Sequence, residues 1–309
     1  MQLSLSKIVK NAFQSSCEEF QRIVAETTSI LSSEDGQVGN FHIVGRLVKM
    51  KPAGNALIIG DMHGDFESLI QVLEESKILG RMQSASDQMV VFLGDYGDRG
   101  PLSVEIYYTV LKLKLHFPGQ VVLMRGNHEG PKDLMASPHD LPGQLQTKFG
   151  QKWTQAYRQL LALHQHLYSA STVQDRYLMI HGGLPEQART LDDLAFAHLK
   201  HPNQQLLEDM LWSDPDETED HTRSSPRGAG KLFGKRTTDE VLDRLNFKVL
   251  IRGHEPCQEG FKLNHDGKVL TLFSRKGPPY FNEHGAYLDV DLSRKVENAE
   301  QLVDSVCSF

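Results

Sequence analysis

Cysteine is scarce in this sequence of 309 residues. The three cysteines, Cys17, Cys257 and Cys307, are odd in number, widely scattered and not in CxxC spacing. This pattern argues against a disulfide framework and favours a protein of a reducing compartment.

Long apolar runs and basic clusters are missing as well. No run is long enough for a signal-peptide core or a membrane span, so the sequence predicts a cytoplasmic protein. Export by a route that needs no N-terminal signal stays open. Lys and Arg number 33 against 40 Asp and Glu, a formal net charge of -7, and no basic stripe is visible. Nucleic acid is therefore not an expected partner.

The composition that remains fits one sizeable hydrophobic core. Hydrophobic residues make up 39% and charged residues 24%, and the length suits a single large α/β domain. We expect an N-terminal helical extension over residues 1–50 and a main domain over residues 51–309. Apolar residues recur at helical spacing from Val9 to Ile30, and residues 41–48 predict a short strand.

Short apolar runs followed by polar, metal-binding types of residue recur along the main domain. They are LIIGDMHGD (57–65), VVFLGDYGDRG (90–100), VLMRGNHEG (122–130), YLMIHGG (177–183) and VLIRGHE (249–255). Each run is typical of a fully buried strand. Helical patterns separate the first three runs, as in βαβ units, and the ends of such strands meet at one edge of a sheet.

The rest of the main domain predicts further regular elements and one long loop. We expect helices at 150–170 and 191–211 and a loop at 213–230. Residues 269–273 and 286–292 predict strands, which we place together in a second sheet packed on the first.

Six side chains at the strand ends form a donor set for metal ions. They are Asp61, His63, Asp95, Asn127, His181 and His254. Oxygen and imidazole groups without a thiolate suit Mn, Fe, Zn or Mg. Two ions about 3.5–4 Å apart that share a bridging carboxylate are a common arrangement for hydrolysing phosphate esters. Any one of these motifs could be turn chemistry, but five at strand ends favour a site.

The motifs GDMHGD (60–65), GDYGDRG (94–100), RGNHE (125–129), HGG (181–183) and RGHE (252–255) resemble a family signature. It is that of the phosphoprotein phosphatases within the calcineurin-like metallophosphoesterases, and the resemblance covers about residues 55–292. It implies an α/β fold in which two mixed β-sheets pack as a sandwich flanked by helices. It also implies a metal-dependent enzyme that hydrolyses phosphoserine and phosphothreonine monoesters in phosphoproteins.

The resemblance further implies how the metals are held. Asp61 and His63 would hold one metal ion, Asp95 would bridge both, and the second would be completed by Asn127, His181 and His254. A hydroxide that bridges the two ions, of which Mn is the expected one, would attack phosphorus directly.

Catalytic and substrate-binding roles are implied in the same way. His128 would protonate the leaving oxygen, and Asp98 would orient His128. The substrate phosphate would be bound by Arg99, Arg227 and Asn127, with Tyr280 beside them. Asp214 matches a position that holds the metal site in shape.

Some parts of the sequence depart from the familiar eukaryotic members of the family. Gly97 and Gly253 stand where those members have Val and Ala, and neither falls on a predicted ligand. Residues 130–142 and 273–288 also differ, which favours a bacterial or archaeal type, or an otherwise divergent member. A phosphotyrosine preference, a diadenosine tetraphosphate or other small-phosphate hydrolase, and an inactive binding scaffold remain alternatives. Oligomeric state and regulatory partners are not predicted.

Overall fold

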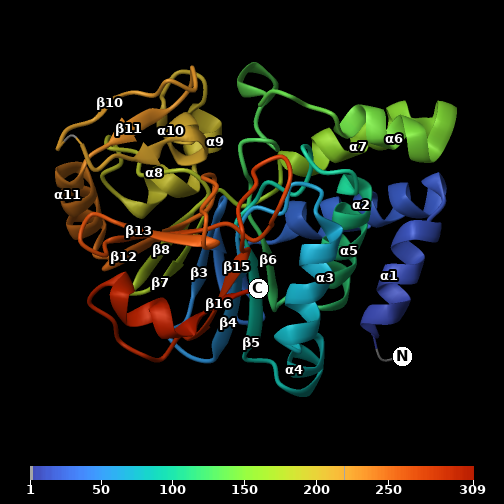
Figure 1. The fold of residues 1–309 in the computed structure, drawn as a ribbon, viewed down its shortest axis with the longest axis horizontal. Helices are drawn as coiled ribbons and strands as arrows, with labels where there is room; N and C mark the ends of the chain where they lie inside the picture. Colours follow the sequence, from blue (N-terminus) through green and yellow to red (C-terminus); the bar gives the residue numbers. More distant parts are fainter. Residues whose placement is uncertain (1–2, 219) are drawn as a thin grey trace.

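The computed structural model describes residues 3–218 and 220–309. Two β-sheets lie face to face in the middle of the molecule, with helices on both outer sides (Figure 1). The fold class predicted above is therefore confirmed. Within the described residues, no helix is both long and apolar enough to cross a membrane.

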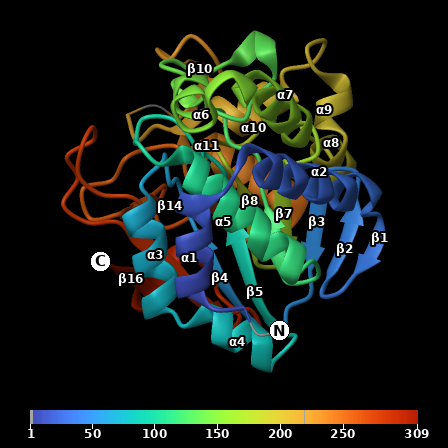
Figure 2. The same cartoon turned by 90° about the vertical axis from the view of Figure 1, so that its right-hand side faces the viewer.

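The smaller sheet carries the first three motif strands. Its strand order is β16-β15-β4-β5-β6, and β4, β5 and β6 run parallel. Its strands are β4 (Asn55–Ile59), β5 (Gln88–Phe92), β6 (Val121–Leu123), β15 (Ala286–Asp291) and β16 (Val306–Ser308). Figure 2 shows α1, α3 and α5 in front of β4 and β5. The apolar runs of β4, β5 and β6 are buried on both faces, which explains why they show no alternation.

The larger sheet carries the other two motif strands. Its order is β1-β2-β3-β7-β8-β12-β14-β13, with β8, β12 and β14 parallel. Its strands are β1 (Gly36–Val38), β2 (Phe41–Val44), β3 (Leu47–Met50), β7 (Ala170–Val173), β8 (Tyr177–Ile180), β12 (Val249–Arg252), β13 (Phe261–Asn264) and β14 (Val269–Leu272). The first three motif strands therefore share one sheet, as the helical patterns between them suggested, and the other two lie in the second sheet.

The two strands predicted near the C-terminus do not share a sheet. β14 pairs with β12 in the larger sheet, whereas β15 pairs antiparallel with β4 in the smaller one. Both are apolar and buried, so their composition alone could not assign them. The predicted loop at 213–230 contains parts of a small third sheet, formed by β9 (Asp214–Pro215), β10 (Arg223–Ser224) and β11 (Lys231–Phe233).

Helices cover both outer faces of the sandwich. They are α1 (Leu5–Gln14), α2 (Cys17–Ser33), α3 (Phe66–Glu75), α4 (Ile78–Ser84), α5 (Ser103–His116), α6 (Leu141–Phe149), α7 (Trp153–His164), α8 (Leu191–Ala195), α9 (Ala197–Lys200), α10 (Leu206–Trp212) and α11 (Lys235–Leu245). The single helix predicted at 191–211 is wrong, because the chain breaks after Ala195 and again at Pro202. Proline has no N–H to continue a helix and disfavours helical geometry in the residue before it.

The first fifty residues are helical only as far as Ser33. From Gly36 onward they form β1, β2 and β3, and β3 pairs with β7 inside the larger sheet. The prediction of a helical extension over residues 1–50 therefore fits only its first part, and residues 1–2 lie outside the described chain. β2 and β3 have only four residues each, and their buried and exposed positions alternate incompletely, so the alternation of apolar and polar residues that marks a strand is weak in the sequence. The domain boundary at residue 50 stays a prediction.

A buried ion pair ties the N-terminal helices to the main domain. Lys114 Nζ on α5 lies 2.8 Å from Glu34 Oε1 at the end of α2, and both side chains are almost fully buried. Burial tends to lower the pKa of Lys114, and Glu34 opposes this. Losing one partner leaves the other charge buried and unpaired.

We expect Glu34→Ala to lower the free energy of unfolding by about 3–5 kcal/mol, measured by urea denaturation. The matched control is Glu26→Ala on the same helix, whose pair with Arg22 is exposed at 3.5 Å. That substitution should change the free energy of unfolding by less than about 0.5 kcal/mol. Equal effects of the two substitutions would contradict the structural role of the buried pair.

Candidate metal centre and active site

The polar residues after five strands converge between the two sheets. Asp61 follows β4, Asp95 follows β5 and Asn127 follows β6, while His181 follows β8 and His254 follows β12. With His63, the structure thus brings together all six side chains of the predicted donor set. All six are buried, with exposed fractions of 6% or less.

The first group of donors consists of Asp61, His63 and Asp95. His63 Nδ1 lies 3.0 Å from the Gly97 carbonyl oxygen, which can only accept, so this nitrogen carries the proton. The lone pair of His63 Nε2 then points toward Asp61 Oδ2 at 3.6 Å and Asp95 Oδ2 at 3.4 Å. Three electron-rich atoms face one another here.

The second group consists of Asp95, Asn127, His181 and His254. His181 Nδ1 donates to the Leu93 carbonyl oxygen at 3.1 Å, and its Nε2 lies 3.5 Å from Asp95 Oδ2. The Asn127 amide lies 3.0 Å from both His181 Nε2 and His254 Nδ1. With the Asn127 amide flipped, so that its nitrogen and oxygen exchange places, the nitrogen would donate to Asp95 Oδ2 at 2.9 Å. Asp95 Oδ2 therefore stands between the two groups.

The charges of the cluster fit divalent cations. Burial lowers the pKa of His63 to about 3 and lowers that of His254, so both are neutral, the form that binds metals. Burial raises the pKa of Asp61 to about 7, and its Oδ2 has no hydrogen-bond partner among the described residues. Burial also tends to lower the pKa of His181, but Asp95 outweighs it and raises the value to about 9. The negative charge that would hold this proton would equally hold a cation.

Backbone strain is concentrated at the same place. His63, Asp95, Asp98, Arg99 and His254 all have positive φ, between 41° and 73°. Such conformations are costly for residues other than glycine and persist where the surrounding structure enforces them, often at functional sites.

Glu129 enforces the turn that presents Asp95. Its buried carboxylate accepts hydrogen bonds from the backbone N–H groups of Asp95, Tyr96 and Gly126 at 2.8–3.1 Å. Tyr107 also donates its hydroxyl to Glu129 at 2.8 Å. No role for Glu129 was predicted, although its position as the last residue of RGNHE was a usable signal.

Asp98 and His128 form the predicted pair beside the metal donors. His128 Nδ1 lies 2.6 Å from Asp98 Oδ2, and the His128 backbone N–H donates to Asp95 Oδ1 at 3.0 Å. Burial alone would raise the pKa of Asp98, but hydrogen bonds from His128 and His139 lower it below the ordinary range. Asp98 is therefore an anion that can hold an imidazole in one orientation. The sequence analysis missed His139.

Arg99 and Tyr280 close the site on the side of His128. Arg99 Nη2 lies 3.5 Å from His128 Nε2, and Nη1 donates to the Tyr280 hydroxyl at 3.4 Å. The Tyr280 ring stacks on His63 with centroids 5.5 Å apart. Arg275, which the sequence analysis did not single out, donates to the His63 carbonyl oxygen at 3.0 Å and lies over the same tyrosine ring.

We expect Arg99→Ala to raise the inhibition constant of inorganic phosphate about 10-fold or more, because it removes charged hydrogen bonds to the anion. Steady-state inhibition assays would measure the change. Arg223→Ala is the control, since Arg223 is exposed and pairs with Asp216 at 2.7 Å. Equal phosphate inhibition in Arg99→Ala and the wild type would contradict a phosphate-binding role.

Arg227 and Asp214 lie on the side of His254. Arg227 Nε donates to Asp214 Oδ2 at 2.6 Å, and Asp214 Oδ1 lies 3.8 Å from His254 Nε2. Fully buried Arg252 also binds Asp214, at 2.8 Å, and donates to the Gly182 carbonyl oxygen. No role was predicted for Arg252, although a charged residue at the end of an apolar run could have indicated one.

Gly253 matters more than the sequence comparison suggested. A Cβ at this position would lie 2.3 Å from Asp61 Oδ1, which accepts the His254 N–H at 2.9 Å. Gly253 is not a predicted ligand, but an alanine there would require the Asp61 carboxylate to shift.

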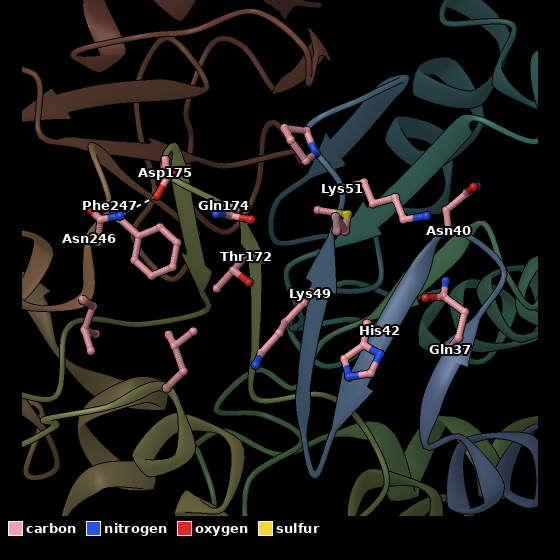
Figure 3. A pocket seen from close by; sticks show the side chains of 14 residues that line it. Gln37, Asn40, His42, Lys49, Lys51, Thr172, Gln174, Asp175, Asn246 and Phe247 are labelled. Atoms are coloured by element: carbon pink, nitrogen blue, oxygen red, sulfur yellow. Dashed lines mark hydrogen bonds between the residues drawn. The ribbon is translucent and has the colours of Figure 1, made fainter.

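Two hollows differ in their relation to this site. One of about 730 Å³ adjoins it and is lined by Arg99, Asp140, Lys148 and half-exposed Phe13, among others. Another, of about 460 Å³, lies over β2, β3 and β7 and contains His42, Lys49 and Thr172 (Figure 3). No predicted site residue lines the second hollow.

Comparison with known proteins agrees with this geometry. A family model described as calcineurin-like phosphoesterase matches residues 54–258. The chain belongs to the calcineurin-like phosphoesterase family, and the resemblance inferred from the motifs is confirmed.

Several proteins similar to this chain are named as protein phosphatases. The chain is 32% identical to the serine/threonine-protein phosphatase 4 catalytic subunit of Eremothecium gossypii, over 77% of this chain and 74% of that protein. It is 33% identical to a protein phosphatase 2A catalytic subunit of Dictyostelium discoideum, over 78% and 74%. A probable serine/threonine-protein phosphatase of Encephalitozoon cuniculi is 32% identical over 84% of this chain, which spans 54% of that protein.

A solved structure shares the whole fold. A protein serine/threonine phosphatase from Saccharomyces cerevisiae superposes with a TM-score of 0.80 at 22% identity, over 99% of this chain and 95% of that chain. The N-terminal helices and the third sheet therefore lie within the shared architecture.

Proposed function

We propose that this protein is a metal-dependent phosphatase that hydrolyses phosphoserine and phosphothreonine monoesters in proteins. The observation that carries the proposal is the position of the Asp98–His128 pair and Arg99 directly beside six converging metal donors. The phosphatases that are 31–32% identical to this chain, named for serine and threonine, support the same substrate class.

The two donor groups would each hold one divalent cation, with Asp95 shared between them. Mn is the ion we expect, and Fe, Zn or Mg suit the same donors. When bound, the cations would make a water molecule more acidic and would supply positive charge beside the phosphoryl group. Asp214, through its approach to His254, would keep that imidazole turned toward the site.

The chain's own residues would then position the substrate and move one proton. Arg99 and Arg227 would bind phosphoryl oxygens, with the Asn127 amide and the Tyr280 hydroxyl beside them. His128 Nε2 faces the same space as Arg99, so it would give its proton to the leaving serine or threonine oxygen. Asp98 would hold the His128 ring for that transfer.

A substrate panel tests the proposal. The purified protein with Mn should hydrolyse phosphoserine and phosphothreonine peptides faster than phosphotyrosine peptides or diadenosine tetraphosphate, as measured by phosphate release. Faster turnover of phosphotyrosine or of the dinucleotide would contradict the proposed substrate class. Inactivity on every substrate, including an aryl phosphate, would contradict the enzyme itself.

A further inference from the structure

One carboxylate in the active site takes hydrogen bonds from two imidazoles. Asp98 Oδ2 lies 2.6 Å from His128 Nδ1 and 2.8 Å from His139 Nδ1. Its other oxygen, Oδ1, accepts the backbone N–H groups of Asp140 and Leu141 at 2.9 and 2.8 Å. Four donors thus surround Asp98, and three of them come from the segment at 139–141.

His139 is itself held in place by Tyr157 of α7. The Tyr157 hydroxyl lies 2.8 Å from His139 Nε2, and the two ring centroids are 5.7 Å apart. Since the Asp98 anion only accepts, His139 donates from Nδ1, and its Nε2 faces the Tyr157 hydroxyl. Directed hydrogen bonds therefore connect Tyr157 through His139 to the carboxylate that holds His128.

The same segment also fixes Arg99. Arg99 Nη2 donates to the Ser137 carbonyl oxygen at 3.0 Å, and the backbone N–H of Arg99 donates to Asp140 Oδ2 at 3.2 Å. The segment at 137–141 thus contacts both Asp98, the partner of His128, and Arg99, the proposed phosphate-binding residue.

We propose that His139, supported by Tyr157, is a positioning residue that locks Asp98 so that His128 delivers its proton to the leaving oxygen. The inference rests on the proposed function. Two donors on Oδ2 prevent Asp98 from rotating or from exchanging His128 for water. A misplaced general acid slows departure of an alkoxide, which needs the proton, more than departure of an activated phenolate.

Substitutions at position 139 test this with two substrates. His139→Leu should lower kcat for a phosphoserine peptide about 10-fold, with KM and the rate on p-nitrophenyl phosphate changed less than about 2-fold. His139→Asn keeps an N–H near the Nδ1 position and should restore most of the loss. Tyr157→Phe should give a smaller loss of the same kind.

The control is His201→Leu, because His201 pairs with Asp133 at 2.8 Å without touching Asp98. It should leave the ratio of the two rates unchanged. Equal losses on both substrates in His139→Leu, or no loss on either, would overturn the positioning role. If His139→Leu does not fold, the rate on the phosphoserine peptide relative to that on p-nitrophenyl phosphate is compared in His139→Asn and Tyr157→Phe. A wild-type value of this ratio in Tyr157→Phe would overturn the proposal.

An activity-independent signal separates this inference from the proposed function. Proton NMR of the full chain should show low-field imidazole N–H signals from both His128 and His139, and His139→Asn should remove the second and shift the first. A wild type inactive on phosphoserine peptides that still shows both signals would contradict the function but support the contact. A wild type in which only the His128 signal is present would overturn the proposed locking of Asp98.

Discussion

Asp95→Ala is expected to abolish turnover and to remove bound metal together. Asp95 Oδ2 lies 3.4 Å from His63 Nε2 and 3.5 Å from His181 Nε2, so a single carboxylate oxygen faces both donor groups. Losing it removes the shared ligand and the negative charge that would hold the cations. The rate should fall at least about a thousandfold, and metal content should fall from two ions per chain to less than one.

The matched control is Asp87→Ala, at the opposite end of β5. Asp87 precedes the strand, and its side chain accepts a hydrogen bond from its neighbour Gln88 at 3.3 Å. Metal analysis and phosphate release should be unchanged in this variant. Full metal content in Asp95→Ala would contradict the bridging position assigned to Asp95.

His128→Asn is expected to slow the reaction while leaving the metals in place. His128 bonds to Asp98 and lies beside Arg99, but it is not among the six predicted metal donors. Loss of a general acid costs about 10²–10⁴ in rate when the leaving group needs a proton. The kcat for a phosphoserine peptide should therefore fall by that factor, and the rate on an aryl phosphate should fall much less.

His116→Asn serves as the control for this substitution, because His116 is exposed at the end of α5. Rates and metal content should match the wild type there. Loss of metal in His128→Asn would show that His128 is a ligand, which its nitrogen positions also allow because they lie near His63 and Asp95. Equal losses on both substrates would argue against proton donation.

Much of the fold could be predicted because its central strands are buried on both faces. β4, β5, β6, β8 and β12 are almost entirely apolar, and the glycine and polar residues that follow within a few positions mark the strand ends. The assignment of strands to sheets could not be predicted in the same way. β14 and β15 have similar composition, and only their pairing with β12 and β4 separates them.

The candidate site could be predicted where its residues lie within a local sequence motif. Asp61, His63 and Asp95 each follow a strand within a distinctive string, and the structure brings them together. His139 and Arg275 instead belong to segments outside the motifs, and their importance comes from contacts with Asp98 and His63. Such contacts join residues 41 and 212 positions apart, a separation that no sequence periodicity encodes.

The most direct measurement is an anomalous-scattering map from crystals of the protein grown with Mn. Two peaks about 3.5–4 Å apart should lie on either side of the Asp95 carboxylate. One should contact Asp61 and His63, and the other should contact Asn127, His181 and His254. A map without metal among these six side chains would contradict a dinuclear centre built from the ends of strands in both sheets.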